Sequence, residues 1–198
     1  MDVAVVDSGG ANIGSVCYAL ERLGARAALT ADPERIRSAE RVILPGVGAA
    51  AEAMRVLDGH GLVEVLRGLE CPLLGICLGM QLLFERSEEG DVDCLGLLPG
   101  QVARLQPAPG IRIPHMGWNR LEPVGESPLM RGLDEGARAY FVHGFAAPVT
   151  ADTVAASTHG QRFAAMVQRG RVAGAQFHPE RSAATGARIL DNFLKGPW

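Results

Sequence analysis

The sequence predicts a single α/β domain with a mixed, mostly parallel sheet and helices on both of its faces. Over residues 1–85, short apolar segments alternate with helix-like segments, which is typical of a parallel sheet covered on both sides. From residue 101 the chain is mainly β-like, and it ends in one more helix-like segment. No repeat, low-complexity tract or linker divides the sequence, so we expect one domain over residues 1–198.

The first half of the chain contains predicted strands at residues 3–6, 26–29, 41–44 and 73–76. Helical spacing of apolar residues predicts helices at residues 13–23, 49–57 and 78–85. Asp32 followed by Pro33 predicts another helix start, because Asp is a good N-cap and proline fits the first helical turn. In open α/β sheets, sites form at the carboxyl ends of strands. We therefore expect functional residues just after the third and fourth strands.

The second half of the chain changes to β-like segments. Predicted strands lie at residues 101–105, 120–123, 138–142, 153–158, 163–168 and 172–177. Arg169 and Gly170 between the last two favour a hairpin turn. A final helix is predicted over residues 182–194. The hairpin brings antiparallel pairing into the sheet, which is why we expect it to be mixed.

Composition and charge are those of an ordinary globular protein and exclude several kinds of partner. Hydrophobic residues make up 47% of the chain and charged residues 21%. A net charge of −3 gives no reason to expect nucleic acid or an acidic membrane surface as partner. No apolar stretch approaches the roughly 18 residues of a membrane span. With no export signal and no metal-like cysteine spacing, we expect a cytoplasmic protein with reduced thiols and with neither metal nor cofactor.

Cys77 stands between Gly75 and Gly79, where the fourth predicted strand passes into a helix. The pattern Gly-x-Cys-x-Gly has the form of a nucleophile elbow, a sharp turn that lifts a reactive side chain above the sheet. The glycines permit the turn and the close approach of neighbouring segments. The helix N-terminus that follows favours a thiolate. The alternative is an inert core cysteine, because a lone Cys in an apolar run is usually buried and unreactive.

A thiolate nucleophile needs a base and a group that orients the base. His178 and Glu180 follow the last predicted strand, and Pro179 between them favours extended geometry at His178. Residues two apart in an extended segment project to the same side, and a carboxylate beside an imidazole fixes its tautomer. The alternative is a loop histidine near a solvated acid. The other histidines lie in predicted turns (His60, His159) or have no acid within two positions (His115, His143).

These motifs together resemble the class I (triad) glutamine amidotransferases. A Pro-Gly-Val-Gly run at residues 45–48, the elbow at residues 75–81 and the Gln-Phe-His-Pro-Glu run at residues 176–180 follow the family's order over nearly the whole chain. The resemblance implies the family's three-layer fold with a nucleophile elbow. It also implies an enzyme that hydrolyses L-glutamine to glutamate and ammonia through a triad of Cys77, His178 and Glu180.

The resemblance further implies which groups stabilise the reaction and which bind the substrate. Backbone N–H groups of Leu78 and of Val47 or Gly48 match the oxyanion hole of the family. Gln81, one helical turn beyond Cys77, and Gly46 match its glutamine-binding positions. For Gln81 the alternative is an exposed helix residue. No cofactor is implied.

Finer motifs resemble one branch of the family, whose members pass ammonia to a (β/α)₈-barrel cyclase subunit in histidine biosynthesis. The Pro-His-Met-Gly-Trp-Asn run at residues 114–119 is the most discriminating of them. The branch implies a heterodimer in which Asn12, Trp118 and Arg181 face the cyclase. For Trp118 the alternative is a core position, and for Asn12 a helix cap. Because ammonia in neutral water is mostly protonated and loses its nucleophilicity, direct transfer to a partner is chemically reasonable.

The chain departs from the family's usual residues at three places. Ser8 stands where tyrosine is usual, Gly144-Phe145 where Ser-Tyr is usual, and Arg181 where lysine is usual. Each departure changes a side chain near the partner or the glutamine, and Arg differs from Lys in hydrogen-bond geometry. None of them touches the triad.

Three other functions stay open on the sequence alone. The first is a glutaminase of another pathway, which the run at residues 114–119 disfavours. The second is a stand-alone thiol hydrolase of the same elbow fold, which would cleave its substrate without a partner. The third is a non-catalytic binding subunit, which the intact set of Cys77, His178 and Glu180 disfavours.

Overall fold

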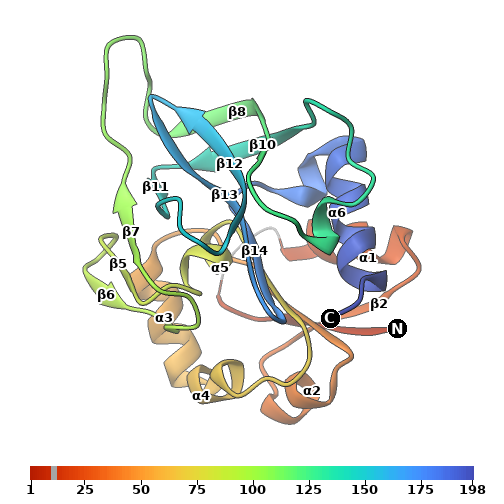
Figure 1. Ribbon diagram of the computed structural model, residues 1–198. Helices are drawn as coiled ribbons and strands as arrows, with labels where there is room; N and C mark the ends of the chain where they lie inside the picture. Colours follow the sequence, from red (N-terminus) through yellow and green to blue (C-terminus); the bar gives the residue numbers. More distant parts are fainter. Residues whose placement is uncertain (10–12) are drawn as a thin grey trace.

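A large mixed sheet forms the centre of the protein (Figure 1). The computed structural model describes residues 1–9 and 13–198. Within them, the order of the sheet is β2-β1-β3-β4-β14-β13-β12-β9. The parallel part consists of β1 (Asp2–Val6), β2 (Arg26–Thr30), β3 (Arg41–Leu44), β4 (Leu73–Ile76) and β14 (Val172–Ala175). The antiparallel part consists of β13 (Gln161–Arg169), β12 (Thr153–His159) and β9 (Glu122–Pro123). The predicted mixed, mostly parallel sheet is confirmed.

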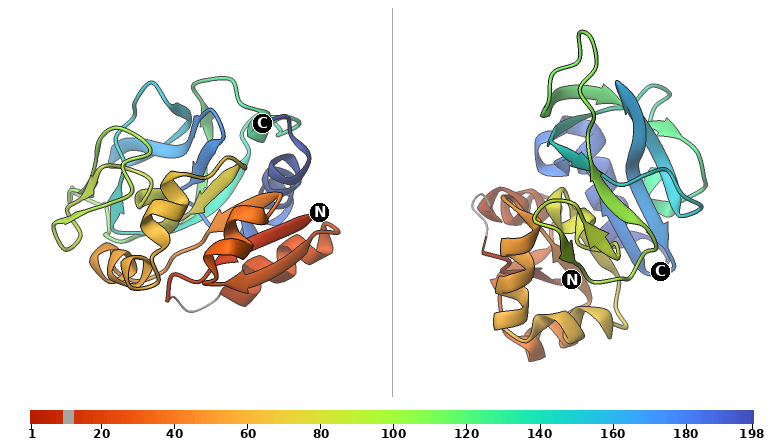
Figure 2. Two further views of the ribbon diagram at one scale, coloured as in Figure 1. Left: turned by 90° about the horizontal axis from the view of Figure 1, so that it is seen from below. Right: turned by 90° about the vertical axis from the view of Figure 1, so that its left-hand side faces the viewer.

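Helices cover both faces of this sheet, which gives three layers (Figure 2). Alternate residues of β1 divide between two hydrophobic cores: Val3 and Val5 point to one, Ala4 and Val6 to the other. The first core holds α1 (Ile13–Arg22) and α6 (Ala183–Lys195). The second holds α2 (Pro33–Ser38), α3 (Ala50–Gly59), α4 (Leu62–Arg67) and α5 (Leu78–Gln81). In the described part of the chain, no helix has the length and apolar character needed to cross a membrane.

Two small sheets of the described residues lie beside the large one (Figure 1). One pairs β8 (His115–Arg120) antiparallel with β10 (Arg138–His143). The other has the order β11-β7-β5-β6, and its strands are β5 (Arg86–Ser87), β6 (Val92–Asp93), β7 (Gln101–Arg104) and β11 (Phe145–Ala146). The described residues also form the 3₁₀ turns η1 (Pro128–Met130) and η2 (Pro179–Arg181).

The helix predicted over residues 78–85 is wrong in length, because α5 ends at Gln81. The N–H groups that would extend the helix bond elsewhere. Those of Leu83 and Phe84 donate three residues back, to Met80 O at 3.1 Å and Gln81 O at 3.2 Å, and that of Glu85 donates to Gly100 O at 3.1 Å. These hydrogen bonds replace the i to i+4 pattern, so the chain turns away after one turn of helix.

The strand predicted over residues 120–123 is also placed wrongly, because β8 occupies residues 115–120 and only two residues form β9. The reason lies in the faces of β8. Met116 and Trp118 point outward and are exposed, whereas His115 on the other face is buried. This reverses the usual pattern of apolar residues inside and polar residues outside. The helix α4 was absent from the sequence prediction altogether.

Candidate active site

Cys77 lies at the sharp turn between β4 and α5 that the sequence predicts. Its backbone has φ +54° and ψ −111°, and its N–H donates to Ala175 O at 2.8 Å. A Cβ at Gly75 would lie 2.6 Å from Gly79 O, and one at Gly79 would overlap Leu44 O. Only glycine therefore fits at both flanks. A positive φ at a non-glycine residue costs free energy, and such strain is typical of functional turns.

His178 and Glu180 are brought together as the sequence predicts, although the chain between them is not extended. The His178 Nδ1 lies 2.9 Å from Glu180 Oε1, and the Glu180 side chain is only 2% exposed. His178 itself has extended angles (φ −98°, ψ 97°), but residues 179–181 form the 3₁₀ turn η2. Ser182 holds this turn, since its hydroxyl donates to His178 O at 2.7 Å and accepts from Tyr140 N–H at 2.9 Å.

The charge state of His178 is set by its two neighbours. Burial by itself lowers the pKa of His178, but hydrogen bonds and charge interactions with Cys77 and Glu180 outweigh it and raise the pKa to about 10. The imidazole of His178 is therefore protonated at neutral pH, and it lines the same cavity as the Cys77 side chain. A positive imidazolium beside a cysteine sulfur is the arrangement that activates thiol nucleophiles in proteins.

A cavity of about 200 Å³ opens beside Cys77 and His178. It is also lined by Val47, Gly48 and Leu78, so the predicted oxyanion positions meet the predicted triad in one place. Gly46 does not line this cavity. It packs beneath the elbow, where an added Cβ would lie 2.9 Å from both Leu78 Cβ and Gly79 N.

Gln81 lies on the same side of α5 as Cys77 and lines the same cavity. Its N–H donates to Cys77 O at 3.3 Å, which places it one helical turn beyond the cysteine. The side chain is buried and not exposed to solvent. Its Nε2 donates to Phe145 O at 2.9 Å and to Gln176 Oε1 at 3.0 Å. Gln176 in turn directs its Nε2 toward Cys77 Sγ at 4.0 Å.

Glu89 and His143 also line the cavity. From the sequence, His143 was only a weaker alternative to His178, and Glu89 was not included. Glu89 comes from the turn between β5 and β6, and its Oε2 accepts from Ala50 N–H at 3.0 Å. Burial raises the pKa of Glu89, and the hydrogen bond from Ala50 partly offsets this rise. In the sequence Glu89 is one acid in a polar turn, and no spacing or periodicity connects that turn to the elbow.

The predicted partner residues are placed on the surface as far as the structure describes them. Trp118 on β8 is 50% exposed, which excludes the core position. Its ring contacts that of Tyr140 with the centroids 6.1 Å apart, and the Arg181 guanidinium lies 5.1 Å from the Tyr140 centroid. Tyr140 thus connects Trp118 and Arg181 in one aromatic and cationic patch. Asn12 lies outside the described residues.

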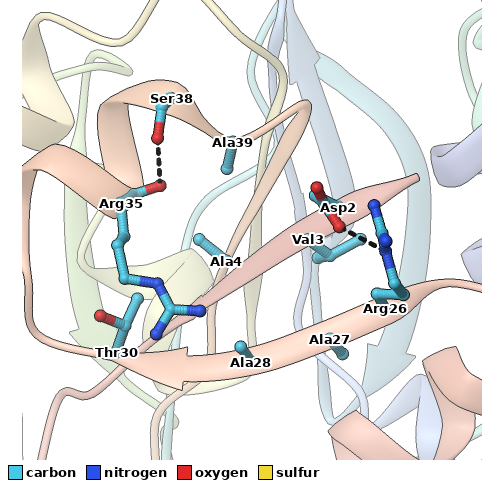
Figure 3. Close-up of a pocket in the computed structure, with 10 residues that line it drawn as sticks. All are labelled: Asp2, Val3, Ala4, Arg26, Ala27, Ala28, Thr30, Arg35, Ser38 and Ala39. Carbon is cyan, nitrogen blue, oxygen red and sulfur yellow. Dashed lines mark hydrogen bonds and ion pairs between the residues drawn. The ribbon is translucent and has the colours of Figure 1, made fainter.

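A larger concavity, of about 420 Å³, lies elsewhere, between β1, β2 and α2 (Figure 3). Its charged lining consists of Arg35 and the exposed ion pair of Arg26 with Asp2 at 2.7 Å. The residues lining it, all of them described, include neither cysteine nor histidine. It therefore lacks the nucleophile and base found beside Cys77, and the cavity at the elbow is the candidate active site.

The fold and the site define the class of protein. The glutamine amidotransferase class-I family matches residues 4–196, and the chain belongs to this family. Solved structures agree on the fold. A putative GMP synthase component from Thermoplasma acidophilum has a TM-score of 0.76 at 20% identity, covering 98% of this chain and 92% of that one. A structure described as a glutamine amidotransferase has a TM-score of 0.75 at 22% identity, covering 98% and 97%.

Curated relatives narrow the class to one kind of subunit. The protein named imidazole glycerol phosphate synthase subunit HisH from Xanthomonas axonopodis pv. citri (strain 306) is 69% identical over 194 residues, which cover 98% of this chain and 97% of that protein. The protein of the same name from Xylella fastidiosa (strain Temecula1 / ATCC 700964) is 63% identical with the same coverage. The resemblance found in the sequence motifs is confirmed at the level of the family and of these relatives.

Proposed function

We propose that this chain is the glutaminase subunit of imidazole glycerol phosphate synthase. It hydrolyses L-glutamine to glutamate and ammonia and passes the ammonia to a cyclase subunit. The cyclase, a lyase-type synthase, forms imidazole glycerol phosphate and aminoimidazole carboxamide ribotide in histidine biosynthesis. The observation that carries the proposal is one cavity lined by Cys77, Gln81 and His178, in which His178 is paired with the buried Glu180. The names and high identity of the curated relatives support the pathway.

In the first half of the proposed reaction the Cys77 thiolate attacks the side-chain amide carbon of glutamine. A C–S bond forms, and the carbonyl electrons move onto oxygen. His178 then gives a proton to the leaving nitrogen, so that the C–N bond breaks and ammonia departs from a glutamyl thioester. The raised pKa of His178 supports its role as this proton donor. Glu180 accepts from Nδ1–H and stabilises the imidazolium.

In the second half a water molecule attacks the thioester while His178 takes its proton. The C–S bond breaks, glutamate is released and the thiolate is restored. Both steps create an oxyanion. We propose that it accepts hydrogen bonds from the N–H of Leu78 and from a second N–H, that of Val47 or Gly48. Gly48 has φ +99° and nothing within 4 Å of an added Cβ. This supports a peptide that can reorient with little steric resistance.

The lining of the cavity supports glutamine as the substrate. Glu89 supplies a partly buried carboxylate that can pair with the α-ammonium group of an amino acid. Gln81 keeps its carbonyl oxygen for a donor on the ligand, because both hydrogens of its Nε2 are used within the protein. A volume of about 200 Å³ suits a single amino acid rather than a peptide.

The surface near the cavity supports a protein partner. The patch formed by Trp118, Tyr140 and Arg181 combines an exposed indole with a cation over an aromatic ring, and Trp, Tyr and Arg are enriched at interface hot spots. We assign this patch, together with Asn12, to the contact with the cyclase.

We also propose that the complex works in the cytoplasm, where the reduced state of four free cysteines is maintained.

A glutaminase assay with and without the cyclase and its substrate tests the proposal. We expect slow hydrolysis by the isolated chain and a clear increase when the ligand-loaded cyclase is added. Cys77→Ala is expected to abolish glutamine-dependent synthesis and to leave synthesis from ammonium salts intact, whereas Cys71→Ala leaves both intact. Equal hydrolysis with and without the cyclase would reject the coupling and favour a stand-alone hydrolase. Retained glutamine-dependent synthesis in Cys77→Ala would reject the nucleophile.

A further inference from the structure

Two buried histidines outside the triad, His115 and His143, face each other across the β8–β10 pair. The His115 Nδ1 lies 3.0 Å from the His143 Nε2. Only His143 reaches the cavity beside Cys77. His115 lies behind it, stacked between the rings of Phe141 and His159 at centroid distances of 4.9 and 4.1 Å. The mechanism above assigns neither histidine a role.

The hydrogen bonds of this pair determine where each proton lies. Phe145 O, a carbonyl that can only accept, lies 2.8 Å from His143 Nδ1, so this nitrogen carries the hydrogen. Burial is the main cause that lowers the pKa of His143, to about 4, and that of His115, to about 3, so both rings are neutral at pH 7. The His143 Nε2 is therefore an acceptor, and His115 Nδ1 must donate to it.

Asn119 completes the chain of donors at its other end. Its Nδ2 lies 3.3 Å from His115 Nε2 and donates its second hydrogen to Thr158 O at 2.8 Å. Its Oδ1 accepts from Arg120 N–H at 2.8 Å, which fixes the orientation of the amide. Every hydrogen bond thus runs in one direction, from Asn119 through both imidazoles to the carbonyl of Phe145.

This carbonyl is shared with the substrate-binding side of the cavity. Phe145 O has two lone pairs and two donors, Nδ1–H of His143 and Nε2–H of Gln81 at 2.9 Å. Gln81 gives its other Nε2 hydrogen to Gln176. With both hydrogens engaged, the Gln81 oxygen is the group left to accept from a ligand. A shift of the Phe145 carbonyl would weaken one of the two hydrogen bonds that orient the side-chain amide of Gln81.

We propose that His115 and His143 are positioning residues for glutamine, which hold the Phe145 carbonyl and through it the amide of Gln81. The inference rests on the proposed function, because it assigns Gln81 to glutamine. It predicts that the pair affects binding of the substrate more than the chemical step. The two histidines act as a unit, because each fixes the tautomer of the other.

Kinetics of glutamine hydrolysis by the complex with the cyclase test the pair. His115→Phe and His143→Phe keep a flat ring but lose the donor, and we expect each to raise the KM for glutamine about tenfold with kcat within about twofold. His115→Asn and His143→Asn place an N–H near the lost Nδ1–H and are expected to restore the KM to within about threefold. His159→Phe is the matched control, since it changes a ring in the same stack outside the chain of hydrogen bonds, and its KM should stay unchanged.

An unchanged KM in the Phe variants would overturn the proposal. So would equal defects in the Phe and Asn variants, because packing rather than hydrogen bonding would then be responsible. ¹⁵N NMR of the histidine rings in the wild-type protein tests the tautomers without any folding risk. We expect neutral rings with hydrogen on Nδ1 at both positions at pH 7, and an Nε2–H tautomer at either would overturn the chain of hydrogen bonds. A wild-type complex without glutaminase activity would instead count against the proposed function, and the NMR result would still decide the direction of the hydrogen bonds.

Discussion

Gly79 lies against the carbonyl oxygen of Leu44, so closely that a Cβ at Gly79 would overlap that oxygen. This contact joins the elbow on α5 to the end of β3, from which the segment at residues 45–48 leaves. This backbone contact therefore sets how close the elbow lies to the start of the proposed oxyanion segment. The site depends on the absence of a side chain at this position.

We expect Gly79→Ala to destabilise the protein by about 1–3 kcal/mol, because the added methyl must displace backbone at the elbow or at β3. Glutaminase activity should fall by more than the loss of folded protein explains, since the displacement separates Cys77 from the proposed oxyanion donors. Gly59→Ala is the control, because an added Cβ there meets nothing within 4 Å. Urea unfolding and glutaminase assays measure both effects, and a Gly79→Ala protein with wild-type stability and activity would contradict the prediction.

The charge of His178 gives a second prediction. Cys77 contributes both a hydrogen bond and a charge interaction that raise the pKa of His178 to about 10, against the effect of burial. Removing the sulfur in Cys77→Ala should therefore lower the pKa of His178, while Glu180 still holds the ring. NMR titration of the His178 imidazole in both proteins measures the difference. An equal pKa in the two proteins would show that the sulfur and the imidazole do not interact.

Acid should destabilise the protein through His115 and His143. In the unfolded chain both rings take up a proton near their ordinary pKa of 6.5. In the folded protein His115 stays neutral down to about pH 3 and His143 down to about pH 4. Lowering the pH from 6.5 to 4 therefore favours the unfolded state, by on the order of 3 kcal/mol for His143 alone.

Thermal unfolding between pH 7 and pH 4 measures this effect. His143→Phe should lose less stability over that range than the wild type, because it has no buried imidazole to protonate at this position. His60→Phe, at an exposed turn position, should follow the wild type. A His143→Phe protein that loses as much stability as the wild type would place the acid sensitivity in other groups.

The parallel half of the fold could be predicted from the sequence, because each of its elements is encoded locally. The short apolar strands and the Asp32–Pro33 helix start need no knowledge of distant residues, and both were confirmed. The elbow was predictable for the same reason, since Gly75 and Gly79 flank Cys77 in the sequence. The proximity of His178 to Glu180 was also predicted, though the turn that creates it was not.

The parts that could not be predicted depend on contacts between distant segments. Helix α5 stops at Gln81 because the following N–H groups bond three residues back and the N–H of Glu85 donates to Gly100 O in a later loop. Glu89 reaches the cavity because its turn packs against the start of α3, and no local pattern encodes that approach. Strand β8 was missed because its exposed face is apolar. An exposed apolar face is typical of an interaction surface, whereas the sequence prediction assumed that apolar residues point to the core.

The exposed face of β8 leads to the last prediction. Trp118→Ala should weaken association with the cyclase by at least about tenfold, because a half-exposed tryptophan in edge-to-face contact with Tyr140 is a typical interface anchor. The stability of the isolated chain should change little, since half of the indole already faces solvent. Leu29→Ala is the matched control, an exposed apolar residue on β2 at the far edge of the sheet. Titration calorimetry with the cyclase measures both variants, and an unchanged dissociation constant for Trp118→Ala would remove β8 from the interface.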